Sequence, residues 1–195
     1  RDDVESRGLG DVYKRQQVEF MTITRQGIVL LGFAILVLFG IVMIIRKVKA
    51  KKVIFNLSFG LYILMIIAFC FFPIRIGVIG EDMPNNFIPF HSIAESVVDS
   101  VKNNTPYGMV SVLGNFIMLM PLGIFFYYCI KDLKIRLLNI FLVSISIEII
   151  QFIIGLLIGY NYRCIDIDDV ILNVLGGIIA VSYTHLRAHE TRRHL

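Results

Sequence analysis

Two short polar stripes interrupt the apolar C-terminal half of the sequence, and they hold the residues best suited to chemistry. Ser144, Glu148 and Gln151 fall at i, i+4 and i+7, so they share one face of a helix. The following segment carries a second stripe at i, i+3 and i+7, formed by Asp166, Asp169 and Asn173. Such groups are costly inside a membrane unless they face partners or a water-filled cavity. We therefore expect an antiparallel helix pair that brings the two stripes together.

The connection between the stripes contributes the nearest cation, Arg163. We expect its guanidinium to form a bidentate pair with Asp166 or Asp169. Glu148 lies deeper, with no obvious cation nearby, and is the candidate general acid or proton carrier. The candidate catalytic residues are Glu148, Asp169 and Asp166, and the candidate substrate-binding residues are Arg163, Gln151, Asn173 and Asn115.

A packing role is the alternative for the same residues. Amide side chains and Glu148 can hydrogen-bond between helices, while Gly176 and Gly177 permit close helix contact. For Asn115, Gln151 or Asn173 taken singly this interpretation is favoured, whereas the combination of carboxylates, an arginine and amides in one layer favours a functional site.

A metal site is a weaker interpretation. Asp166, Asp168 and Asp169 supply three carboxylates, but Asp168 faces away from the other two, and acidic residues also suit the positive end of a helix dipole. His91 and Glu95 are spaced as two ligands on one helix, but lack a third. We expect no metal and no other cofactor.

Composition places the chain in the membrane. Its 195 residues are 56% hydrophobic, and the mean hydropathy is +0.75. The net charge of +4 comes from positives in short loops rather than on one face, which excludes nucleic acid as a partner. The expected partners are the lipid bilayer and a lipid-linked envelope precursor.

The apolar runs predict an all-α, polytopic transmembrane bundle of about five spans. Pro121 lies inside the third run and should kink it. In the long third connection, His91, Glu95 and Asp99 lie on one face of a helix and apolar residues on another, which predicts a short interfacial helix. The predicted spans are residues 27–45, 53–74, 108–130, 135–158 and 167–180.

Basic residues predict the orientation of the bundle. Loops 46–52 and 131–136 are rich in lysine and arginine, so the positive-inside rule places both in the cytoplasm. The connection 75–107 is then extracytoplasmic. The polar stripes would lie in the outer half of the bilayer.

Both ends differ from the rest of the chain. Residues 1–16 are charged and polar, and residues 181–195 turn an apolar helix into a peptide rich in histidine and arginine. Both resemble translated adapter sequence, so we expect them to be non-native and residues 21–180 to form the membrane domain. The last span would then be truncated.

Four motifs in order resemble the VanZ-like family of small bacterial membrane proteins, named for a teicoplanin-resistance protein. They are Asn86-x2-Pro89-Phe90, Gly114-Asn115-x5-Pro121-x-Gly123, Ser144-x3-Glu148-x2-Gln151 and Arg163-x2-Asp166-x2-Asp169-x3-Asn173-x2-Gly176. The resemblance implies an all-helical domain in the bacterial cell membrane and, for some members, a contribution to glycopeptide or lipoglycopeptide resistance. It supplies no settled reaction.

Two hypotheses for the function follow. In the first, the cluster is a membrane-embedded site that binds or modifies an envelope amphiphile from the outer side, with Arg163 meeting an anionic group. In the second, the protein is not an enzyme and acts as a binder, a proton path or an assembly partner, with the cluster as packing glue. The isosteric change Glu148→Gln should abolish chemistry and largely spare the non-catalytic roles.

Overall fold

Five helices in the described part of the chain are long and apolar enough to cross a membrane. The structure is a computed structural model that describes residues 21–77 and 82–193. It confirms the all-helical, polytopic bundle, and the predicted leader 1–16 lies outside the described residues. The spans are α2 (Arg25–Ile45), α3 (Ala50–Phe71), α5 with α6 (Tyr107–Met118 and Met120–Cys129), α7 (Leu133–Ile158) and most of α8 (Ile167–Arg193).

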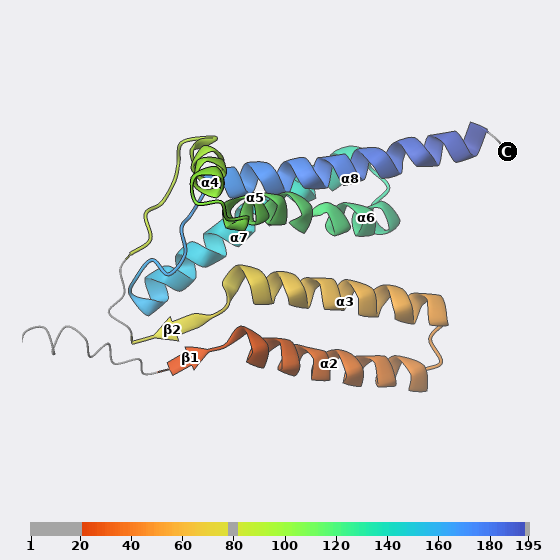
Figure 1. Ribbon diagram of the computed structural model, residues 1–195. Helices are drawn as coiled ribbons and strands as arrows, with labels where there is room; N and C mark the ends of the chain where they lie inside the picture. Colours follow the sequence, from red (N-terminus) through yellow and green to blue (C-terminus); the bar gives the residue numbers. More distant parts are fainter. Residues whose placement is uncertain (1–20, 78–81, 194–195) are drawn as a thin grey trace, which may run out of the picture.

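The spans form two layers (Figure 1). In one layer α2 and α3 run side by side as an antiparallel hairpin. In the other, α8 packs against α5, α6 and α7. The predicted pairing of the two helices that carry the polar stripes therefore occurs, because α7 and α8 are neighbours.

Local sequence signals explain where the helices begin and end. The Thr24 side chain accepts the amide of Gly27 at the start of α2, and Asp132 accepts the amides of Lys134 and Ile135 at the start of α7. Each side chain satisfies amides that have no partner inside the helix. Gly159 ends α7 with a φ of 84°, a left-handed conformation that glycine adopts without steric cost.

The third span is broken rather than smoothly kinked. α5 ends at Met118, Leu119 forms the junction, and α6 restarts at Met120. Pro121 therefore occupies the first turn of α6, where its missing N–H has no helical partner to lose. The expected kink thus takes the form of a break between two helices, with Pro121 at the start of the second.

A small β ladder, which the sequence did not predict, closes the α2–α3 hairpin. Strand β1 (Met21–Ile23) pairs antiparallel with β2 (Ile74–Ile76). The predicted second span, 53–74, lies three residues further along the chain than the helix, because α3 (Ala50–Phe71) ends at Phe71 and the chain becomes extended before Pro73. Proline lacks the N–H that a continuing helix would need.

The predicted short helix in the long connection is present as α4 (His91–Lys102), which contacts α5 and the start of α8. In Figure 1 it lies at the end of the bundle where α8 begins. Its position at the bilayer interface stays a prediction.

Close contact of α8 with α5 and α6 depends on small residues. A Cβ at Gly176 would lie 1.7 Å from the backbone oxygen of Phe116, so only glycine fits there. A Cβ at Gly123 would lie 3.0 Å from the oxygen of Gly177. Small residues allow helix backbones to approach in this way in membranes.

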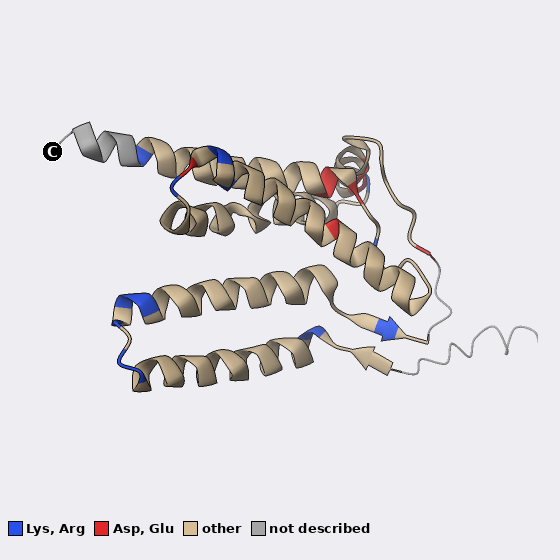
Figure 2. Ribbon diagram, turned by 180° about the vertical axis from the view of Figure 1, so that it is seen from behind, with Lys and Arg blue, Asp and Glu red and all other residues tan. Residues whose placement is uncertain are grey.

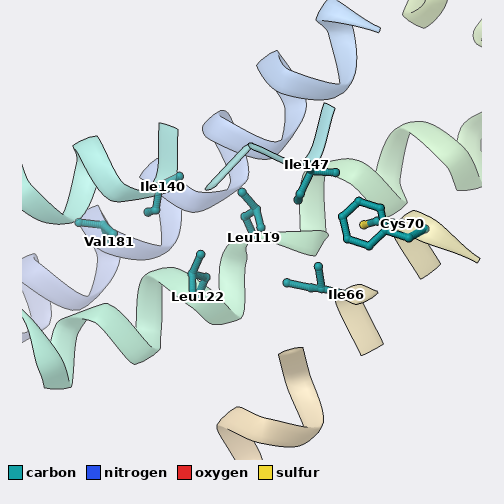
Figure 3. Close-up of a cluster of buried hydrophobic side chains, with 8 residues drawn as sticks. Ile66, Cys70, Leu119, Leu122, Ile140, Ile147 and Val181 are labelled. Atoms are coloured by element: carbon teal, nitrogen blue, oxygen red, sulfur yellow. The ribbon is translucent and has the colours of Figure 1, made fainter. Parts of the chain in front are cut away.

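The central apolar cluster joins both layers. Figure 3 shows Ile66 and Cys70 of α3 beside Leu119 and Ile147. Val181 of α8 belongs to the same cluster and is fully buried. The structure thus continues α8 as packed helix through the start of the tail that we expect to be non-native.

Charged residues divide the bundle into two ends. Figure 2 shows the basic α2–α3 and α6–α7 connections at one end, and the acidic residues of α7 and of the start of α8 nearer the other. Arg136 is buried in the basic end, where it donates to the carbonyls of Ile130 and Lys131 and lies over the ring of Tyr127. The two loops predicted to be cytoplasmic therefore share one end of the bundle.

Candidate functional site

The polar stripe of α7 is buried, and its residues contact different helices. The Ser144 hydroxyl lies 3.3 Å from the carbonyl oxygen of Val170 in α8. Glu148 Oε2 accepts the backbone N–H of Asp166 at 3.2 Å. Gln151 instead donates to the carbonyl oxygen of Cys70 in α3 at 2.9 Å. The stripe therefore joins α7 to both layers rather than to α8 alone.

Asp166 is a junction between the start of α8 and the long third connection. Its Oδ1 accepts the N–H of Asp168 at 2.9 Å and the side-chain amide of Asn86 at 2.8 Å. The backbone of Asn86 also bonds to Ile165 and Ile167. With all these contacts, Asp166 has a clear positioning role.

Asp168 is the polar residue that the sequence interpretation most underrated. It is only 1% exposed, and its carboxylate accepts the backbone amides of Phe90 and Ile93 at the start of α4. It lines the smaller cavity together with Asp166 and Asp169, so the expectation that it faces away from both is not met. Its place directly before Asp169 of the stripe gave no sign of this.

Asp169 pairs with an amide rather than with a cation. The side chain of Asn115 in α5 donates to Asp169 Oδ1 in α8. Two candidate residues from separate spans are thereby brought together. This contact fixes one carboxylate oxygen and leaves Oδ2 for another partner.

Arg163 does not form the expected bidentate pair. Its Nη2 donates to the carbonyl oxygens of Phe69 and Phe72 at 3.0 and 3.2 Å. Within the described ranges, no ion pair within 4.0 Å joins it to Asp166 or Asp169. The physical reason is that α3 ends beside it and presents carbonyls that no longer have helical donors.

Six of the seven candidate residues line one cavity of about 520 Å³ between α3, α5, α7 and α8. Asp166 is the exception and lines a smaller cavity of about 190 Å³, together with Asp168 and Asp169. Asn115 and Asp169 line both, so the two cavities are adjacent. The polar lining of the large cavity includes Asn115, Glu148, Gln151, Arg163, Asp169 and Asn173, and its apolar lining includes Tyr62, Met65, Ile66, Phe69, Ile117, Met118 and Ile147.

Asn173 is unsatisfied in this cavity. It is 1% exposed, and in the described part of the chain neither its Oδ1 nor its Nδ2 has a hydrogen-bond partner. Buried amides usually find partners, because an unpaired one loses its hydration without compensation. Both side-chain amide atoms of Asn173 are therefore available for hydrogen bonds to a molecule in the cavity.

Two side chains in the connection between α7 and α8, outside the spans, have raised pKa values. Burial raises the pKa of the Cys164 thiol, and the nearby Asp166 carboxylate raises it further. Burial likewise raises the pKa of Tyr162. Both side chains are therefore kept in their neutral forms.

Metal ligation finds no support in the geometry of the described residues. Among them, no group of three or more His, Cys, Asp or Glu side chains is placed to hold a metal ion. His91 and Glu95 lie 3.6 Å apart on the exposed side of α4 and are ordinary helix neighbours.

The fold and the cavity define a class of protein: a polytopic helical membrane protein with a cavity between its spans that combines apolar walls with a cluster of polar groups. A sequence model of the VanZ/LLP1 family matches residues 59–187, most of the chain. The protein belongs to the VanZ/LLP1 family, as the four motifs indicated. No curated protein and no solved structure matches it.

Proposed function

We propose that the protein binds a membrane amphiphile, such as a lipid-linked precursor of the bacterial envelope, in the large cavity. The observation that carries the proposal is the lining of that cavity, which combines apolar walls with a cluster of buried polar groups. Ligand sites are commonly apolar pockets with a few placed polar groups. The acyl chains of an amphiphile match the apolar walls, and its headgroup matches the polar cluster.

The exposure of the apolar wall supports a ligand that arrives from the bilayer. Phe69 and Ile117 line the cavity and are 50% and 53% exposed, so the apolar wall is not closed off by the protein. Acyl chains could therefore extend past these side chains into the surrounding lipid while a headgroup occupies the polar part.

Packing explains some of the cluster, but not all of it. Ser144, Gln151 and Asn115 each hydrogen-bond between helices, which favours a structural role for these three. Asn173 has no such partner in the described residues. The function proposed here therefore rests chiefly on Asn173, Glu148 and Asp169.

Membership of the family supports a further, biological proposal. We infer that the protein resides in the bacterial plasma membrane with its basic loops inside, and that ligand binding alters susceptibility to glycopeptides of the teicoplanin type. The site would then face the outer half of the bilayer, where envelope precursors are used.

Gly114→Phe tests the binding proposal directly. Gly114 lines the cavity, and a Cβ there would meet no atom within 4 Å, so a side chain can extend from this position and its aromatic ring should fill part of the cavity. The protein is purified in mild detergent, and the lipids that remain bound are quantified by mass spectrometry. We expect the parent chain to retain lipid, Gly114→Phe to lose it, and the control Ala34→Phe, on the exposed side of α2, to retain it. Equal retention by the parent and by folded Gly114→Phe would overturn the proposal.

Susceptibility of a bacterial host tests the biological part. Strains express the parent chain or Glu148→Gln at matched membrane abundance, and growth is measured with teicoplanin and with vancomycin. Protection that disappears with Glu148→Gln would support a functional carboxylate. Protection that persists would assign Glu148 to packing, and no protection by either would remove the resistance role.

A further inference from the structure

We propose that the cavity recognises an amphiphile with a zwitterionic amino-phosphate head, whose primary ammonium meets Glu148, Asp169 and Asn173 and whose phosphate meets Arg163. This inference rests on the proposed amphiphile-binding function and specifies the ligand class. It adds a primary ammonium to the anionic group that the sequence led us to expect at Arg163.

The first argument is the balance of acceptors and donors. The hydrogen bonds of Glu148, Asp169 and Gln151 use Oε2, Oδ1 and Nε2 respectively. This leaves Glu148 Oε1, Asp169 Oδ2 and Gln151 Oε1 as acceptors, and Asn173 Oδ1 adds a fourth. A primary ammonium carries three N–H donors and no acceptor, which is the complementary set.

Asn173 provides the observation that requires a ligand. It is nearly fully buried, lines the cavity, and has neither amide atom paired within the described part of the chain. Its Oδ1 can accept an ammonium N–H, and its Nδ2 can donate to an ester or phosphate oxygen of the same head. Both orphaned atoms would then be satisfied by one molecule.

Arg163 provides the second charge. Its two hydrogen bonds to α3 carbonyls both use Nη2. Its Nε and Nη1 are available for phosphate oxygens, with which guanidinium groups form strong, directional hydrogen bonds. Holding Arg163 through Nη2 fixes the guanidinium at the cavity wall before a ligand arrives.

Charge favours a zwitterion over a purely anionic head. Two carboxylates face the cavity against one guanidinium, so an anion without an amine would enter an excess of negative charge. Unpaired charge is expensive where water is excluded. In a zwitterionic head the ammonium would meet the carboxylates, and the phosphate would meet the guanidinium of Arg163.

A headgroup series tests the proposal on the unmodified protein. Phosphatidylethanolamine, phosphatidylcholine and phosphatidylglycerol with identical acyl chains are titrated into the delipidated protein, and occupancy is followed by native mass spectrometry. Phosphatidylcholine keeps the charge but has no N–H donors, and phosphatidylglycerol keeps the phosphate but has no ammonium. We expect phosphatidylethanolamine to bind at least about tenfold more tightly than either, the effect of one or more lost charge-assisted hydrogen bonds.

Variants assign the preference to named residues. Glu148→Gln and Asn173→Leu should each reduce phosphatidylethanolamine binding toward the phosphatidylcholine level, and Arg163→Gln should weaken all three phospholipids. Ser146→Ala is the control, because Ser146 is exposed on α7 and bonds only to Leu142 of its own helix. Thermal unfolding of each variant shows whether it remains folded.

The outcomes separate this inference from the function on which it rests. Equal binding of the three phospholipids, abolished by Gly114→Phe, would overturn the amine preference and leave amphiphile binding in place. If none of the three phospholipids binds, or if Gly114→Phe leaves their binding unchanged, the amine preference and the amphiphile-binding function are both overturned.

Discussion

The carboxylate of Asp168, at the start of α8, accepts the backbone N–H of Phe90 immediately before α4. Phe90 has a φ of 66°, in the left-handed region that costs a non-glycine residue about 1–2 kcal/mol. The same carboxylate accepts the N–H of Ile93 at 3.2 Å. One buried side chain therefore ties α4 to the helix that carries Asp169 and Asn173.

Removal of this carboxylate should loosen α4. Asp168→Ala leaves two helix-start amides without an acceptor, a loss comparable to a helix cap, about 0.5–2 kcal/mol. We expect faster hydrogen–deuterium exchange of the amides of α4, measured by mass spectrometry. Asp99→Ala, on the exposed side of α4, is the control. Unchanged exchange in Asp168→Ala would show that other contacts hold α4.

Gly176 should tolerate no side chain. Gly176→Ala would place Cβ against the carbonyl oxygen of Phe116 and push α5 from α8, and overpacking of this kind costs about 1–3 kcal/mol. We expect a lower unfolding temperature and lower membrane abundance, followed by thermal denaturation and immunoblotting. Gly114→Ala should remain close to the parent, since open space surrounds that position. Equal stability of the two variants would contradict the close approach.

Gln151 should hold α3 against α7. Gln151→Leu removes the donor to the carbonyl of Cys70, and a buried acceptor left unpaired costs about 1–3 kcal/mol. Cys70 is 6% exposed, so we expect N-ethylmaleimide to label it faster when α3 moves away. Asn139→Leu is the matched control, because Asn139 donates to Ile135 within α7. The same labelling rate in both variants would count against the role of Gln151.

The orientation in the membrane can be tested by thiol labelling of intact cells. In a background without Cys70, Cys129 and Cys164, we expect a membrane-impermeant maleimide to label Asn103→Cys but not Lys51→Cys. Both positions are exposed, at the C-terminus of α4 and the start of α3. The expectation follows from the basic loops lying inside. Labelling of Lys51→Cys but not of Asn103→Cys would show that the protein has the opposite orientation in the membrane.

Cys164 should react slowly at neutral pH. Burial and the Asp166 carboxylate raise the pKa of its thiol, so the reactive thiolate is scarcer than for an ordinary cysteine. The rate of iodoacetamide labelling should rise with pH and continue to rise above the usual thiol pKa, while the same cysteine in detergent-denatured protein levels off earlier. Mass spectrometry of the peptide gives both rates. Coincident pH profiles would contradict the shift.

The periodic features of the sequence predicted much of the fold and site. Apolar runs predicted the five spans, because a helix that crosses the hydrocarbon core of a bilayer must expose mainly apolar side chains to the lipid. The 3.6-residue period placed Ser144, Glu148 and Gln151 on one face. The same reasoning predicted that α7 and α8 would pair, and the resemblance to the family added Asn115 to the candidate site.

Only the tertiary structure decided which partner each polar group takes. Gln151 bonds to a residue 81 positions away, and Arg163 to one 94 positions away. Spacing along a helix describes a face, but it contains no information on which distant backbone carbonyl will lack a donor beside that face. The end of α3 at Phe71 exposed such carbonyls, and the packing of the helices left both side-chain amide atoms of Asn173 without a hydrogen-bond partner among the described residues. The sequence by itself thus determined which groups must be buried, and the packing of the helices determined which of them remain available for a ligand.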